Sequence, residues 1–212
     1  MKSLAVQQIR EAIEHGELRA GEKVTELGLA KKLGVGQPTI REAFLELEFL
    51  GFIERKGPRD TRVTLLTRSA IRDIYRVRVR LETLAVELIV AMETPDLSAC
   101  WSEALRMEHA ARDGRAADFY QADLAFHREL WAVTRNESLR GCLEQVVPKL
   151  MTFSIIQRVQ PTPEKLLEIA ILHRVLLETI SSRDMKNSVA VMEESMKNAL
   201  MDDERMPGLD LS

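Results

Sequence analysis

Strand-forming patterns occur in one short region of this 212-residue chain. Residues 52–55 and 61–65 alternate loosely between apolar and polar types, and a turn-rich segment around Gly57 and Pro58 separates them. Two such runs joined by a turn predict a β-hairpin. Most of the remaining chain has apolar residues at helical spacing. The chain is therefore predicted to be mainly α-helical, with one small β-element in its N-terminal third.

Glycine and proline residues divide the helical regions into segments. Gly16, Gly34 and Gly51 stand where helices of the first third would end, and Pro38 suits the first turn of a helix because its missing N–H would be unpaired there. The expected helices cover residues 3–15, 26–33, 38–50, 69–92, 97–113, 116–134, 137–157, 163–182 and 185–201. Three helices followed by a hairpin predict a winged helix-turn-helix in residues 1–66. Residues 67–206 are predicted to form an all-helical domain, and residues 207–212 a disordered tail.

Bulk properties exclude several classes of protein. The formal net charge is −3, so a nucleic-acid-binding surface has to be a local patch. The two cysteines form no CxxC pair, which favours a reducing compartment. No apolar run reaches the length of about 18–20 residues that spans a bilayer, and the N-terminus has no apolar signal region. We therefore expect a cytoplasmic protein that does not enter a membrane.

The third predicted helix has the two faces of a DNA-recognition helix. Its apolar positions recur along one side as Ile40, Phe44, Leu47 and Leu50. Polar residues able to contact bases or phosphates gather near its start, in the preceding helix and in the hairpin, and the predicted DNA-binding set is Gln37, Thr39, Arg41, Lys32, Lys56, Gly57 and Arg59. Residues 31–62 carry seven basic and five acidic side chains, a local excess of +2. The alternative is that these bases form an ordinary solvated face.

The N-terminal region resembles the DNA-binding domain of GntR-type transcription regulators. The resemblance is carried by residues 13–24 (IEHGELRAGEKV), 26–35 (ELGLAKKLGV), 41–48 (REAFLELE) and the following 51–53 (GFI). It implies double-stranded DNA as the partner. The family usually has Ser-Arg where this chain has Gly36-Gln37, with the proline one position later. Glutamine suits adenine rather than guanine, so the operator is expected to differ from common family operators.

An arginine lies in the apolar stripe of the predicted helix 69–92. Ile71, Ile74, Leu81, Ala85, Leu88 and Met92 form the stripe, and Arg78 falls within it. A buried guanidinium is costly without a partner. One interpretation is an ion pair with Glu82, four residues on, or a side chain that reaches solvent. The other is an arginine that grips a carboxylate ligand with two hydrogen bonds.

Three further ligand-type residues are expected to point inward. Asp123 and His127 are four residues apart and share one helix face, flanked by large apolar side chains, while His173 stands in a helix that is apolar on almost every side. A single buried histidine is usually structural, but three inward-facing groups of these types favour a divalent metal site.

The C-terminal region resembles the FCD ligand-binding domain of the FadR subfamily. The resemblance rests on residues 77–82 (VRVRLE), 123–127 (DLAFH), 136–139 (NESL) and on His173 followed by Ile180 and Asp184. It implies an all-α antiparallel helical bundle in which an Asp and three His hold zinc or nickel below a small carboxylate. The third histidine would fall at Ser195. The predicted metal ligands are Asp123, His127 and His173, and the predicted effector contacts are Arg78, Ser195 and Asn136.

These features predict a homodimeric regulator that binds a near-palindromic operator under the control of a small organic acid. Because serine is a poor zinc ligand, a metal-free domain that senses a larger acyl ligand is an alternative. A hydrolase-like enzyme that uses Asp123, His127 and His173 to activate water is a second alternative. A helical interaction module whose winged helix binds protein is a third.

Overall fold

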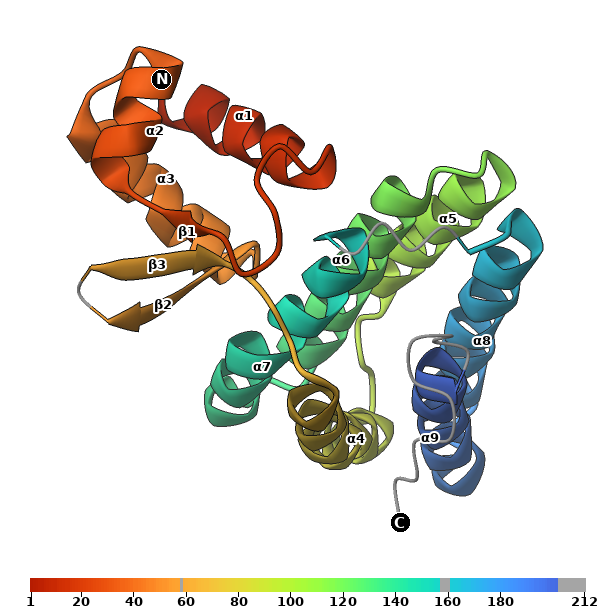
Figure 1. The fold of residues 1–212 in the computed structure, drawn as a ribbon. Coiled ribbons are helices and arrows are strands. Elements are labelled where there is room, and N and C mark those ends of the chain that lie inside the picture. Colours follow the sequence, from red (N-terminus) through yellow and green to blue (C-terminus); the bar gives the residue numbers. More distant parts are fainter. Residues whose placement is uncertain (58, 157–160, 202–212) are drawn as a thin grey trace. The chain divides into compact units, whose positions relative to one another are not determined.

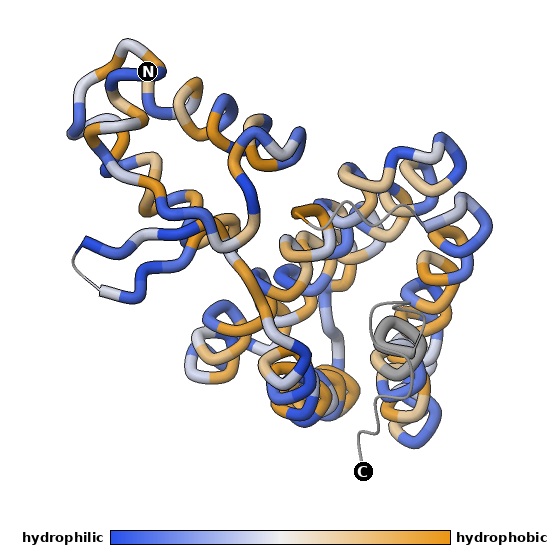
Figure 2. The backbone as a smooth tube through the Cα atoms, viewed as in Figure 1, coloured by the Kyte–Doolittle hydropathy of each residue, from blue (hydrophilic) through white to orange (hydrophobic). Residues whose placement is uncertain are grey.

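A computed structural model describes residues 1–57, 59–156 and 161–201, shown as a ribbon in Figure 1. The predicted tail, 207–212, lies outside the described residues. The chain divides into two compact units. Unit 1 comprises Met1–Leu66 with Pro148–Val159, and unit 2 comprises Thr67–Val147 with Gln160–Ser212. In Figure 2 hydrophobic and hydrophilic residues alternate along the helices of both units, as expected of amphipathic helices that each cover a core.

Unit 1 combines three helices with a small antiparallel sheet. The helices are α1 (Lys2–Glu14), α2 (Glu26–Leu33) and α3 (Gln37–Phe49), and the strands are β1 (Lys23–Val24), β2 (Ile53–Gly57) and β3 (Asp60–Val63) in the order β1-β3-β2. The hairpin β2-β3 and the helix positions confirm the predicted winged-helix class. β1 was not predicted, because two residues are too short to show an alternating pattern. The core contains Ile9, Ile13, Ile40, Phe44 and Leu47.

Local chemistry sets the helix ends of unit 1. The Thr25 side chain accepts a hydrogen bond from the Gly28 amide and caps α2, and Gly34, with φ +66°, follows the last turn. Gly51 has φ +81° and lies against the backbone of Pro148 and Lys149. A side chain at Gly51 would clash with this segment of the chain.

The segment that completes unit 1 comes from α7 (Glu137–Ile156). The Thr152 hydroxyl donates to the Leu50 carbonyl at 2.5 Å, and Ile156 joins the unit 1 core. The sequence pattern does not predict this contribution, because it depends on contacts between residues about a hundred positions apart.

Unit 2 is a helical bundle around a second core. It contains the first half of α7 together with α4 (Arg68–Val90), α5 (Ser98–Arg112), α6 (Ala116–Val133), α8 (Pro163–Ser181) and α9 (Met185–Met201). α5 packs on α6 and α8, and α9 packs on α4 and α8. The helix bounds agree with the predicted ones within two residues at each end. Among the described residues, none of the helices has the length and apolar character needed to cross a bilayer.

The buried face of α4 is rotated from the predicted stripe. Ile74, Leu81 and Leu88 are only half-buried. The buried line instead runs through Ile71, Tyr75, Arg78, Glu82, Ala85, Val86, Ile89 and Val90. The rotation places two charged side chains in the middle of the buried face, so they have to find partners inside unit 2.

Candidate metal centre and nucleic-acid interface

Charged and polar side chains from three helices of unit 2 meet in its interior. They are Arg78 and Glu82 of α4, Asp123, His127 and Trp131 of α6, and His173 of α8. Spacings of four residues put the members from α4 and from α6 each on one helix face. Arg78, Glu82, His127 and His173 are at most 3% exposed. Four of the residues singled out from the sequence therefore share one site, which we call the central cluster: Arg78, Asp123, His127 and His173.

Glu82 is the anion at the base of the central cluster. Its Oε1 accepts a hydrogen bond from Arg78 Nε at 3.2 Å, and its Oε2 accepts one from the Trp131 indole at 2.8 Å. Burial alone would raise the pKa of Glu82. The charge and hydrogen bond of His127 in its protonated form, the charge of Arg78 and the hydrogen bond from Trp131 outweigh burial and hold that pKa at about 2. Glu82 is therefore ionised near neutral pH. The ion pair between Arg78 and Glu82 was one of the two interpretations of Arg78.

The partners of the two histidines fix which ring nitrogen carries the proton. Arg78 Nη2 lies 2.9 Å from His127 Nε2 and can only donate, so Nε2 holds the lone pair and Nδ1, 3.0 Å from Glu82 Oε1, holds the proton. His173 Nδ1 lies 2.8 Å from the Ile169 carbonyl, which also can only accept. Burial lowers the pKa of His127, which favours its neutral form. In the neutral tautomers the Nε2 atoms of both rings present lone pairs.

Those two lone pairs converge with a carboxylate. His127 Nε2 lies 3.4 Å from His173 Nε2, and Asp123 Oδ1 lies 3.1 Å from His173 Nε2 and 3.6 Å from His127 Nε2. Asp123 Oδ1 is buried and has no hydrogen-bond partner. Acceptors this close repel one another unless a proton or a cation lies among them, and Arg78 supplies one hydrogen bond, to His127 Nε2. Neighbouring ligands of an ion bound at 2.0–2.2 Å are about 3–3.6 Å apart, so these residues fit a divalent metal.

The Nδ1 atoms of the two histidines have partners that orient the rings. The contact of Glu82 with His127 Nδ1 and that of the Ile169 carbonyl with His173 Nδ1 are of the kind that orient metal-binding histidines. Arg78 Nη2 lies 2.9 Å from His127 Nε2 and donates to its lone pair. Helical spacing could not reveal this contact between α4 and α6, because the two residues are 49 positions apart.

The two remaining effector candidates have different settings. Ser195 is buried on α9, in line with the buried Met192 and Met196. Asn136 caps α7, where its Oδ1 accepts a hydrogen bond from the Leu139 amide at 3.0 Å. The structure thus gives Asn136 a local role in starting a helix, and its assignment to the effector stays a prediction.

The predicted DNA-reading residues lie at the N-terminal end of α3. Gln37 and Arg41 are exposed, and Thr39 is half-buried. Arg41 donates to both carboxylate oxygens of Glu26, at 2.9 Å from Nη2 and 3.1 Å from Nε. The hydrogen bond from Arg41 lowers the pKa of Glu26. Glu26 was missed as a functional candidate, since it lies on another helix and its contact with Arg41 is tertiary.

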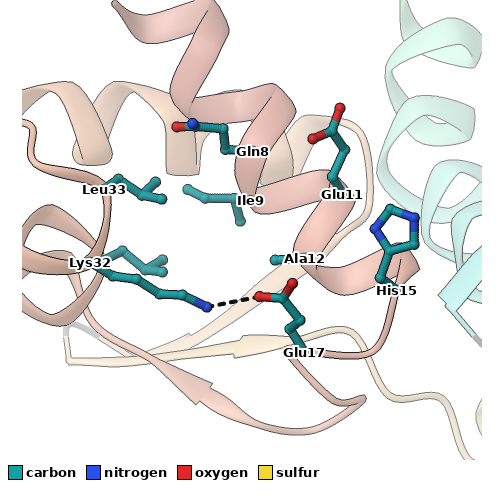
Figure 3. A pocket seen from close by; sticks show the side chains of 9 residues that line it. Gln8, Ile9, Glu11, Ala12, His15, Glu17, Lys32 and Leu33 are labelled. Atoms are coloured by element: carbon teal, nitrogen blue, oxygen red, sulfur yellow. Dashed lines mark hydrogen bonds and ion pairs between the residues drawn. The ribbon is translucent and has the colours of Figure 1, made fainter.

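The basic side chains outside α3 are exposed and partly paired. Lys56 in the wing lies 3.1 Å from Glu54, Gly57 pairs with Asp60 across the hairpin, and Arg59 is exposed. Lys32 reaches across an open cleft of about 180 Å³ between α1 and α2 to Glu17, at 3.1 Å (Figure 3). Exposed pairs of this kind contribute little to stability, so these bases can exchange their partners for phosphates.

Comparisons with known proteins find relatives among bacterial transcription regulators. The chain is 30% identical over 141 residues to the uncharacterized HTH-type transcriptional regulator YdhC of Bacillus subtilis, a match that covers 66% of this chain and 63% of that protein. The match therefore spans less than two thirds of that relative. The chain is also 25% identical to the gluconate operon transcriptional repressor of Bacillus subtilis, over 84% of this chain and 74% of the repressor.

A solved structure shows the same fold. E. coli McbR/YncC superimposes with a TM-score of 0.73 and 20% identity, covering 93% of this chain and 94% of that one. Residues 2–63 match the family of bacterial regulatory proteins, gntR family, and residues 73–198 match the FCD domain. The chain belongs to the GntR family of bacterial regulatory proteins, in the group that carries an FCD domain.

Proposed function

We propose that this protein is a transcription regulator whose affinity for DNA is controlled by a small organic acid bound at the central cluster. The observation that carries the proposal is the convergence of two histidine lone pairs and the Asp123 carboxylate within unit 2. A purely structural core has no need for three buried acceptors that face one another.

The central cluster supplies what a carboxylate sensor needs. Asp123, His127 and His173 would hold a zinc or nickel ion, which when bound offers an open position to an oxygen ligand. Ser195, with its neutral hydroxyl, would leave that position to water or effector. Arg78 adds a guanidinium that suits a carboxylate. The related protein whose name refers to gluconate, a hydroxy acid, supports this class of ligand.

Unit 1 supplies the DNA contacts. Gln37 and Thr39 would read base edges in the major groove, and Arg41, held by Glu26, would reach a base or a phosphate. Lys32, Lys56 and Arg59 would bind phosphates, with the backbone at Gly57 close to the duplex. A homodimer would place two α3 helices about one helical turn apart on a near-palindromic operator. Effector binding would then favour one spacing between the two copies of unit 1 in the dimer over another.

The DNA-binding half of the proposal is tested with the duplex upstream of the protein's own gene. Fluorescence anisotropy would compare this duplex with a scrambled duplex of equal length between 50 and 200 mM salt. Four basic side chains per protomer, eight in a dimer, predict a log–log salt slope of about −7. Equal affinity for both duplexes at every salt concentration would contradict sequence-specific binding, and the absence of salt-dependent affinity for either duplex would favour a protein-binding module.

A further inference from the structure

The Arg78 guanidinium bridges two groups of the central cluster. Its Nε donates to Glu82 Oε1 at 3.2 Å, and its Nη2 donates to His127 Nε2 at 2.9 Å. Since His127 Nδ1 faces the Glu82 carboxylate and carries the proton, Nε2 has one lone pair, in the plane of the ring. That lone pair is the same one that a metal ion would take.

We propose that Arg78 and the divalent ion compete for the lone pair of His127 Nε2, so that metal binding releases Arg78 from His127 and makes it the anchor for the effector carboxylate. The inference rests on the proposed metal centre and adds a rule for the order of binding. When no metal is bound, Arg78 occupies the His127 Nε2 lone pair that the metal ion would take.

The release of Arg78 creates a demand for an anion. Its Nε bond to Glu82 does not involve His127, so this tether can persist while Nη2 loses its acceptor. A buried N–H without an acceptor is unfavourable, and more so on a charged group. A carboxylate fits this need, because its two oxygens match the planar array of guanidinium donors.

Formal charge leads to the same ligand class. Arg78 carries +1, and the carboxylates of Glu82 and Asp123 carry −1 each when ionised. These side chains therefore sum to −1, and a divalent ion changes the sum to +1. A single carboxylate brings it to zero. Because unbalanced buried charge is costly, metal and one carboxylate group are expected to bind cooperatively.

The competition predicts that weakening Arg78 strengthens metal binding. Arg78→Lys keeps the charge and can still pair with Glu82, but its nitrogen ends one bond short of the arginine Nη atoms. Arg78→Met removes both charge and donor. The control is Arg174→Met, which removes an exposed positive charge next to His173 in the sequence, where Arg174 pairs with Glu108.

The experiment is a calorimetric titration of Zn²⁺ into the chelator-treated full-length protein. The expected result is that Arg78→Lys and Arg78→Met bind Zn²⁺ about tenfold tighter than wild type or more, the size of one charge-assisted hydrogen bond, while Arg174→Met stays within about threefold. If wild type binds Zn²⁺ and both Arg78 variants bind it equally or more weakly, the competition is wrong while the metal centre stands.

The remaining outcomes separate the inference from the proposed function. Zn²⁺ uptake by an Arg78 variant but not by wild type would support the competition and contradict a native metal centre. No uptake by any of the proteins would overturn both. Should both variants fail to fold, side-chain NMR of wild type decides: Zn²⁺ has to shift the Arg78 Nη signals together with the His127 ring signals. Unchanged Arg78 signals beside shifted His127 signals would overturn the competition.

Discussion

Replacing Glu82 by glutamine tests whether the central cluster is held together by a buried charge. Glutamine keeps the shape and can still accept the Trp131 hydrogen bond, but it leaves the Arg78 guanidinium without its anion. The pKa of Glu82, about 2 against an ordinary 4.5, means that the ionised form stabilises the fold by about 3 kcal/mol relative to the neutral form. Breaking a buried pair by removing one partner costs about 3–5 kcal/mol, which agrees.

The assay is urea unfolding of wild type and Glu82→Gln between pH 2 and pH 7. The folded-state pKa of Glu82 is depressed, so its stabilisation is fully present above about pH 4.5 and is lost as the pH falls toward 2. The gap between the two proteins should therefore be about 3 kcal/mol at pH 7 and shrink below pH 4.5. The control Glu168→Gln, which loses an exposed pair with Lys165, should cost no more than about 0.5 kcal/mol. A Glu82→Gln protein as stable as wild type at pH 7 would refute the reasoning.

Three further results are expected. Gly51→Ala should lower the unfolding free energy by about 2 kcal/mol or more in urea titrations, since its Cβ would lie 2.7 Å from the Pro148 carbonyl. The control Gly34→Ala, at a glycine that also has positive φ but faces open space, should cost about 1 kcal/mol. Equal costs for the two variants would contradict the clash. Arg41→Ala should weaken binding to the protein's own upstream DNA about tenfold or more in gel shifts, with an unchanged circular dichroism spectrum; unchanged affinity would remove Arg41 from the interface. His127→Ala should lose the zinc or nickel that wild type retains in elemental analysis, and full metal content in the variant would disprove its role as a ligand.

Much of the fold was predictable because glycines and polar N-cap residues mark the helix ends. The glycines at 34 and 51 follow the helices that they were expected to end, and Thr67 caps α4 as a polar residue before a helical run should. The grouping of Asp123 with His127 followed from their spacing on α6, and both residues reach the central cluster. Patterns of this local kind depend on a few neighbouring residues, so they can be read without knowing the fold.

What depends on tertiary contacts could not be predicted in the same way. The rotation of α4 that centres Arg78 and Glu82 depends on how α6, α8 and above all α9 pack on it, because a stripe of apolar residues defines a helix face only approximately. The contact between Arg78 and His127 joins two helices, and helical periodicity carries no information about which faces meet. The α7 segment that completes unit 1 belongs to the same class.

The most direct measurement is the change in DNA affinity on adding organic acids to metal-loaded protein. Anisotropy titrations with the upstream duplex, with and without gluconate and other small carboxylates, would be run on wild type and on His127→Ala. We expect at least one acid to change the dissociation constant of wild type by about tenfold, within the usual range of coupling free energies, and to leave the variant unaffected. A response of equal size in both proteins would show that the acid acts elsewhere than at His127, Asp123 and His173.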